Sequence, residues 1–180
     1  MATNRDWADA YLAQARADLV GAQLVGTNEP SVFAMLMQMV FEKFAKAALL
    51  RSGSITMEVA SKTHKAASLM MKTMRLQRGL MAPMGGPHVW HRAFEVVDAL
   101  ERANPSEVRR GLRKAGAEAD VLARGAAQLE YPWETPAGQV QWPARDLDIV
   151  AKLGDPRNNL AAHLSAFASK LDRYFDAIFQ

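Results

Sequence analysis

Three residues near the carboxyl end of the chain have side chains suited to the chemistry of a phosphate. Arg157 and Asn158 are adjacent, and His163 follows after four intervening residues. Arginine keeps its charge and presents a fork of donors that fits a phosphate, whereas histidine titrates near neutral pH and can move a proton. An arginine and a histidine close to a helix start are also common as solvated or capping residues, so the residue types alone leave both interpretations open.

The sequence around these residues predicts the start of a helix. Gly154 is suited to ending a preceding helix, Asp155 is a good N-cap, and Pro156 fits the first helical position because its missing N–H is not needed there. Arg157 and His163 then flank the apolar line of the predicted helix on opposite sides. That line consists of Leu160, Leu164, Phe167, Leu171, Tyr174, Phe175 and Ile178.

Length and composition favour one domain over residues 1–180. The chain has 180 residues, 49% of them hydrophobic, and a net charge of +3, which permits an acidic partner without requiring one. The absence of cysteine excludes disulfides, thiolate catalysis and cysteine-ligated zinc. The first residues lack the apolar core of a signal peptide, and no stretch reaches the roughly 20 apolar residues of a membrane span. We therefore expect a soluble, cytoplasmic protein with no membrane partner.

The hydrophobic periodicity predicts an all-α, up-and-down helical bundle. The motif Asn104-Pro105-Ser106-Glu107 is typical of a helix start. No strand pattern is evident, and the segments 80–87 and 130–143 are rich in proline and glycine, which favours loops. Predicted helices span residues 4–26, 31–51, 57 or 63 to 78, 88–103, 104–129 and 143–153, ahead of the final helix.

Other clusters of residues carry weaker signals. His88 and His91 are three positions apart on a predicted helix, but no third ligand completes a metal site, so we expect none. The many methionines are suited to filling a core or to lining an adaptable binding surface. Two predicted helices carry several cations each, which form either a solvated face or a surface that attracts a polyanion. These cations are Lys62, Lys65, Lys72, Arg75 and Arg78, and Arg109, Arg110, Arg113 and Lys114.

Over most of its length the chain resembles HEPN domains, which are helical domains of prokaryotic toxin-antitoxin and phage-defence systems. The resemblance rests on the Arg-polar-x4-His motif of Arg157, Asn158 and His163 and on three looser matches that precede it. Residues 80–129 are less like a minimal family member and are interpreted as a helical insertion. The looser matches are Ala15-Arg16-Ala17-Asp18-Leu19, Phe41-Glu42-Lys43-Phe44-Ala45-Lys46-Ala47 and Thr63-His64.

The resemblance implies a metal-independent endoribonuclease that needs no cofactor. The resemblance also implies a homodimer, in which the motifs of the two chains would meet in one cleft. The apolar line of the final helix could supply the dimer interface. By similarity, His163 would serve as general acid or base on the ribose 2′-hydroxyl, and Arg157 would stabilise charge on the scissile phosphate. Asn158 would donate or accept a hydrogen bond with the substrate, or would position the histidine. The product would carry a 2′,3′-cyclic phosphate.

The sequence also departs from part of the family. Some members carry a tyrosine two positions after the motif histidine, which a nucleotidyltransferase antitoxin modifies, whereas Ser165 stands there in this chain. A nucleotidyltransferase partner would then act by binding alone. Two alternatives stay open: a non-catalytic HEPN subunit that binds a nucleotidyltransferase or a nucleotide, and an unrelated helical interaction protein that carries the motif by chance.

Overall fold

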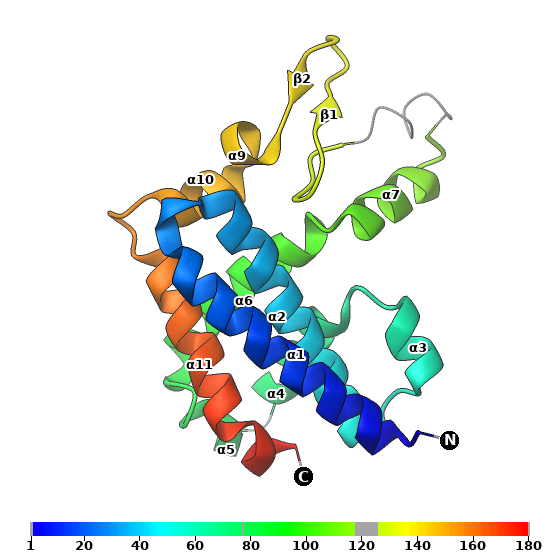
Figure 1. Ribbon diagram of the computed structural model, residues 1–180, viewed down its shortest axis with the longest axis vertical. Coiled ribbons are helices and arrows are strands. Elements are labelled where there is room, and N and C mark those ends of the chain that lie inside the picture. The colour runs from blue at the N-terminus through cyan, green and yellow to red at the C-terminus, as the bar shows by residue number, and fades with distance from the viewer. Residues whose placement is uncertain (1, 77, 118–125, 180) are drawn as a thin grey trace.

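The fold is all-α with one small β-hairpin, as Figure 1 shows. The computed structural model describes residues 2–76, 78–117 and 126–179. No helix in these ranges is long and apolar enough to cross a membrane. The elements, in chain order, are α1 (Asn4–Val25), the short 3-10 helix η1 (Gly26–Asn28), α2 (Pro30–Arg51), α3 (Met57–Lys62), α4 (Ala66–Arg75), α5 (Arg78–Met81), α6 (Gly86–Arg102), α7 (Pro105–Lys114), β1 (Trp133–Glu134), β2 (Val140–Gln141), α9 (Pro143–Asp146), α10 (Asp148–Gly154) and α11 (Leu160–Ile178).

Helix α2 lies at the centre of the molecule and packs against α1, α4, α6, α10 and α11. It is apolar nearly all round, as a helix surrounded by others must be. Its Phe41 and Phe44 rings meet Phe167 and Phe175 of α11 at centroid distances of 6.2 and 5.7 Å. Trp90 of α6 approaches Phe167 edge-on at 5.3 Å. These aromatic contacts join α2, α6 and α11 into one core.

The apolar line of α11 belongs to that core. Leu164, Phe167, Leu171 and Phe175 are each at most 1% exposed, because α1, α2 and α6 of the same chain cover them. The expectation that this line forms the interface of a homodimer is therefore wrong. A homodimer would have to use another surface.

Helix α6 makes the middle of the chain part of the core, since Trp90, Val97 and Leu100 are at most 2% exposed. The predicted start at Asn104 is confirmed, because its side chain accepts a hydrogen bond from Ser106 N–H at 3.0 Å. The prediction of one unbroken helix to residue 129 is wrong, since α7 ends at Lys114 and residues 115–117 and 126–129 are not helical; residues 118–125 of the predicted helix lie outside the described residues. That residues 80–129 are an insertion stays a prediction.

Gly116 explains why α7 ends early. It adopts a φ of +73°, which favours glycine, and its N–H donates to the carbonyl of Arg113 while Ala117 N–H donates to that of Leu112. These two bonds are the Schellman pattern of a helix end. The predicted helix of residues 104–129 contains Gly116, a residue expected to weaken its middle or to interrupt it. In the structure Gly116 directly follows the C-cap residue, Ala115.

Three further segments differ from the predictions. Of the two starts predicted for the helix up to residue 78, 57 and 63, the later one lies within three residues of the start of α4, whereas residues 57–62 form the separate helix α3. The predicted loop of residues 130–143 contains the antiparallel pair β1–β2, whose turn includes Gly138 at a φ of +77°. The predicted helix of residues 143–153 is broken at Leu147, whose backbone is extended. Each difference arises at a short element, where local pattern carries little information.

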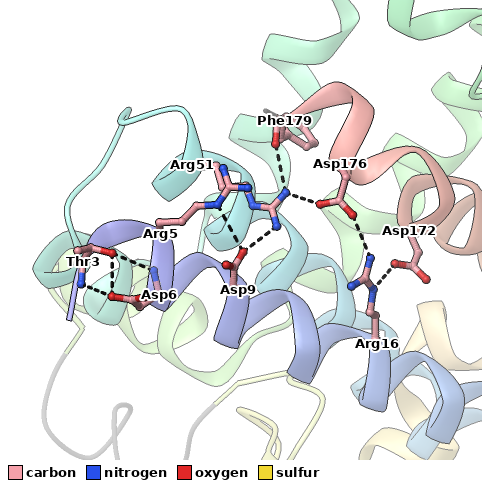
Figure 2. A network of polar contacts seen from close by, with 9 residues as sticks. All are labelled: Thr3, Arg5, Asp6, Asp9, Arg16, Arg51, Asp172, Asp176 and Phe179. Carbon is pink, nitrogen blue, oxygen red and sulfur yellow. Dashed lines mark hydrogen bonds and ion pairs between the residues drawn. The ribbon is translucent and has the colours of Figure 1, made fainter.

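A network of ion pairs joins α1, α2 and the carboxyl end of α11 (Figure 2). Arg51, at the end of α2, donates to the carboxylates of Asp9 and Asp176 and to the carbonyl of Phe179. Arg16 of α1 binds Asp172 at 2.6 Å and Asp176 at 3.7 Å. The last turns of α11 are thus bound to two other helices.

Candidate active site

The segment that carries the Arg-polar-x4-His motif begins with a turn and enters α11 at Leu160. The prediction of a helix starting at Pro156 is wrong, because the Asp155 carboxylate accepts from Arg157 N–H at 3.0 Å within a turn. Asn159 adopts the left-handed region at a φ of +52°, which interrupts any helix that crosses it. Arg157 therefore precedes the helix, and His163 lies in its first turns.

Gly154, the last residue of α10, fixes where this turn leaves the body of the protein. A Cβ atom at Gly154 would lie 2.8 Å from Cγ of Pro30, the first residue of α2. That distance is too short for any side chain, and the proline ring is rigid. The turn therefore starts at a close contact between α10 and α2.

Asn158 positions the turn. Its Nδ2 donates to the carbonyl of Lys152 at 2.9 Å, and its Oδ1 accepts from Leu160 N–H at 2.8 Å. One side chain thus joins the end of α10 to the start of α11. Of the two expected roles of Asn158, binding a substrate or positioning the histidine, the contacts fit support of the segment around His163.

His163 is half-buried, and its ring is oriented by α6. Nε2 lies 3.2 Å from the carbonyl oxygen of Val89. A carbonyl can only accept, so Nε2 carries the proton and Nδ1 of the neutral ring is the acceptor. Within the described residues Nδ1 has no hydrogen-bond partner, and it is not among the buried polar atoms that lack one. The imidazole is therefore held in one orientation with its basic nitrogen accessible.

Arg157 lies at the surface, with a side chain that is 88% exposed. Its Nε and Nη2 donate to the two carboxylate oxygens of Asp155, each at 2.9 Å. These bonds lower the pKa of Asp155 to about 2 and raise that of Arg157. The pair is local and open to solvent, so a phosphate could take the place of the carboxylate on the same fork of donors.

The structure adds Arg92 to the candidate residues. This exposed arginine of α6 donates through Nη2 to the carbonyl of Asn158. Arg92 follows Val89 by three positions, so the two lie on the same face of α6 and both reach the motif segment. Sequence reasoning missed Arg92, because no pattern along the chain shows that α6 packs beside the start of α11.

Residues from the looser family matches also meet, but in a different place. Lys43 of α2 binds Asp18 of α1, and Lys46 binds Glu42 at 2.7 Å. His64 lies between α3 and α4 with Nδ1 3.4 Å from Glu42. These side chains are 32% exposed or less, so they join elements of the bundle and are poorly placed for a large substrate.

The two histidines weighed as metal ligands are exposed residues of α6. His91 lies 3.2 Å from the carboxylate of Glu95, one helical turn away. Within the part of the chain that the structure describes, no three histidine or acidic side chains form a group suited to a metal ion. The histidine that α6 orients on α11, His163, remains the candidate for proton transfer.

Comparison of the chain with protein-family models, with curated proteins and with solved structures gave no match. The HEPN resemblance therefore depends on the sequence motifs alone and stays a prediction. The residues whose geometry bears on function are Arg92, Arg157 and His163.

Proposed function

We propose that this protein is a metal-independent endoribonuclease of the HEPN type, with a role as a toxin or as an effector of phage defence. The observation that carries the proposal is the orientation of His163. Its Nε2–H is bound to the Val89 carbonyl, so its Nδ1 is a fixed, accessible base on the same segment that carries the exposed Arg157 and accepts a hydrogen bond from Arg92 at Asn158. A base and a phosphate-binding group are two of the requirements of RNA cleavage by the neighbouring 2′-hydroxyl, alongside an acid that protonates the departing oxygen.

In the proposed reaction, Nδ1 of His163 accepts the proton of a ribose 2′-hydroxyl. The 2′-oxygen then bonds to the adjacent phosphorus while the bond from phosphorus to the 5′-oxygen breaks. The products are a 2′,3′-cyclic phosphate and a 5′-hydroxyl, which takes its proton from an acid. No metal or cofactor is needed, because every step is a proton transfer or a displacement at phosphorus.

The arginines would neutralise charge on the reacting phosphate. Arg157 would exchange the Asp155 carboxylate for two phosphate oxygens, since both groups accept its parallel N–H donors. Arg92 would contribute a second positive charge from α6. Substitution of a donor of this kind in other enzymes reduces the rate by about 100-fold or more.

A second copy of the chain would complete the site. The reaction needs both a base and an acid, and the motif supplies one histidine per chain. In a homodimer formed around the turn of residues 155–159, the partner copy would supply the second imidazole. The buried apolar line of α11 is not used in this arrangement. A nucleotidyltransferase antitoxin would then silence the protein by binding, since Ser165 replaces the tyrosine that is modified in some relatives of the HEPN type.

The substitution His163→Gln tests the base most directly. Glutamine retains a donor for the Val89 carbonyl but has no titratable nitrogen. Wild type, His163→Gln and His163→Ala would be compared on a mixed RNA pool in EDTA, after circular dichroism and light scattering confirm equal folding and oligomeric state. We expect cleavage to fall by about 100-fold or more in both variants.

The chemistry of the products provides an independent check. Wild-type cleavage should leave 2′,3′-cyclic phosphate ends and should stop where a 2′-deoxynucleotide replaces the ribonucleotide at the cut. Equal cleavage by His163→Gln would contradict the proposed base. A folded wild type that cuts no RNA would favour the non-catalytic binding subunit, and the neutral Asp155–Arg157 pair is the observation consistent with that alternative.

A further inference from the structure

A cavity of about 390 Å³ lies between α4 and α6, and the motif does not account for it. It is lined from α6 by Trp90, His91 and Phe94, whereas Val89 on another side of the same helix reaches His163. A volume of this size is within the range of small-molecule sites. The cavity is therefore separate from the histidine but lies beside the same turns of α6.

The inner wall of the cavity is apolar and includes two aromatic side chains. Trp90 is 2% exposed and Met71 is buried, while Phe94 is half-buried at the side. Aromatic faces and a polarisable thioether are suited to a planar ring. Nucleobases stack on side chains of this kind, at a gain in affinity that does not depend on the base.

The rim of the cavity is cationic. Lys72 and Arg75 extend from α4, and His88 and His91 from α6. Nζ of Lys72 lies 6.0 Å from the centre of the Phe94 ring, so a positive charge stands directly beside the apolar wall. None of the described residues that line the cavity is acidic. Such a rim repels metal cations and attracts an anion.

The start of α6 adds to the positive potential. The residue before it, Gly85, offers no side-chain cap, so the N–H groups of the first turn, which Pro87 lacks, receive no cap bond from it. Pro87 and His88 of that turn line the cavity. The positive end of the helix dipole therefore faces the same space as the cationic side chains.

We infer that this cavity binds a nucleoside monophosphate, with the base against Trp90 and Phe94 and the phosphate at Lys72 and Arg75. The ligand is either a free nucleotide or one residue of an RNA strand, since both present a flat ring and a phosphate. The inference goes beyond the proposed cleavage and does not depend on it. Core packing explains neither the volume nor the placement of two cationic side chains and two histidines around it.

Isothermal titration calorimetry on the full chain tests the inference, with adenosine 5′-monophosphate, inorganic phosphate, adenosine and a short RNA as separate ligands. We expect saturable binding of the monophosphate, and binding of phosphate or adenosine at least tenfold weaker. Replacing Lys72 and Arg75 together by alanine should weaken binding of the monophosphate by about tenfold or more. The matched control replaces Lys62 and Arg109, which are exposed on α3 and α7, and should leave it unchanged.

A second variant separates the base from the phosphate. Phe94→Leu keeps most of the apolar volume but removes the flat face, so adenosine 5′-monophosphate should bind several-fold more weakly while inorganic phosphate is unaffected. RNA that binds more tightly than the monophosphate, and loses that advantage in the Lys72/Arg75 variant, would identify a strand as the source. Equal binding would identify the free nucleotide.

Three outcomes would overturn the inference. These are no saturable binding of either the monophosphate or RNA to the folded wild type, equal affinities for the monophosphate and inorganic phosphate, and equal weakening by the Lys72/Arg75 and Lys62/Arg109 variants. Each of them can occur whether or not the protein cuts RNA at His163, so failure of this inference and failure of the proposed cleavage are distinguishable.

Discussion

The two ends of α11 use arginine in opposite ways. At the carboxyl end, Arg51 is 5% exposed, lies over the Phe175 ring at 5.2 Å and is shared by Asp9 and Asp176 (Figure 2). At the amino end, Arg157 is 88% exposed and, among the described residues, pairs only within its own turn, with Asp155. The first arginine joins three elements, whereas the second joins two residues that are already neighbours in sequence.

This difference separates a structural arginine from one that is available to a ligand. Burial by itself would lower the pKa of Arg51, but its hydrogen bonds to Asp176 and Asp9 raise it, so the charge is kept within a set of fixed partners. Removing Arg157 from Asp155 breaks no contact between elements of the fold. Arg157 can therefore change partners without a cost to the packing of the bundle.

The largest expected effect is that of Arg157→Ala, at the amino end of α11, on RNA cleavage. We expect RNA cleavage to fall by about 100-fold, because the charge on the phosphate loses a donor pair, and the free energy of unfolding to stay unchanged within error, because Arg157 is exposed. Cleavage rates in EDTA and urea unfolding would measure both. Arg5→Ala is the matched control, because Arg5 also pairs locally with an aspartate at the surface, and it should change neither quantity.

Arg51→Ala should give the reverse result. We expect a loss of about 2 kcal/mol of unfolding free energy, because the buried stem and its contact with Phe175 disappear. The loss stays below that of a fully buried ion pair, since Asp9 and Asp176 are 53% and 65% exposed and return to solvent. Equal stability of Arg51→Ala and Arg157→Ala in urea unfolding would contradict the comparison.

Asp155→Asn tests whether the Asp155 carboxylate competes with RNA phosphate for Arg157, at the amino end of α11. Asparagine retains an oxygen for Arg157 N–H but loses the charge that occupies the guanidinium. We expect RNA to bind about fivefold more tightly at low salt, because one competing negative charge is removed. Fluorescence anisotropy would measure the affinity. Asp148→Asn removes a more exposed charge nearby, 81% exposed against 29% for Asp155, and the same gain there would show a general effect of charge instead.

The smallest expected effect is the contribution of Asp176, at the carboxyl end of α11, to the loss of stability at acidic pH. The hydrogen bond from Arg51 keeps the pKa of Asp176 below its ordinary 3.8. A lowered pKa stabilises the fold above the pKa of the unfolded chain, and this contribution is lost as pH falls through the folded value. Because Asp176 is exposed, we expect its contribution to the free energy of unfolding to be about 0.5 kcal/mol. Urea unfolding from pH 6 to pH 3 should show a smaller acid-induced loss in Asp176→Asn than in wild type.

The long helices were predictable from sequence, because each buries a face whose period extends over several turns. The predicted ranges 4–26, 31–51 and 88–103 agree with α1, α2 and α6 to within two residues at each end. The buried positions of these helices recur at the helical period, so apolar residues mark them in the sequence.

The candidate site was predictable only in part. His163 and Arg157 are identifiable by residue type and spacing, whereas Arg92 and the Val89 carbonyl reach the site through the packing of α6. The helix start was placed at Pro156 because Asp155 is suited to capping, and the same carboxylate also closes a tight turn with Arg157. The local sequence does not show whether the carboxylate of an aspartate caps a helix or closes a tight turn.

The close contact between Gly154 and Pro30 has a consequence for sequence variation. Substitution of Gly154 would force α10 away from α2, and the left-handed Asn159 tolerates little besides glycine, asparagine or aspartate. The two positions are five residues apart, and His163 follows four residues after the second. A saturation-mutagenesis profile would therefore show three intolerant columns at fixed intervals. That pattern is a longer and more selective signature for finding homologues than an arginine and a histidine alone.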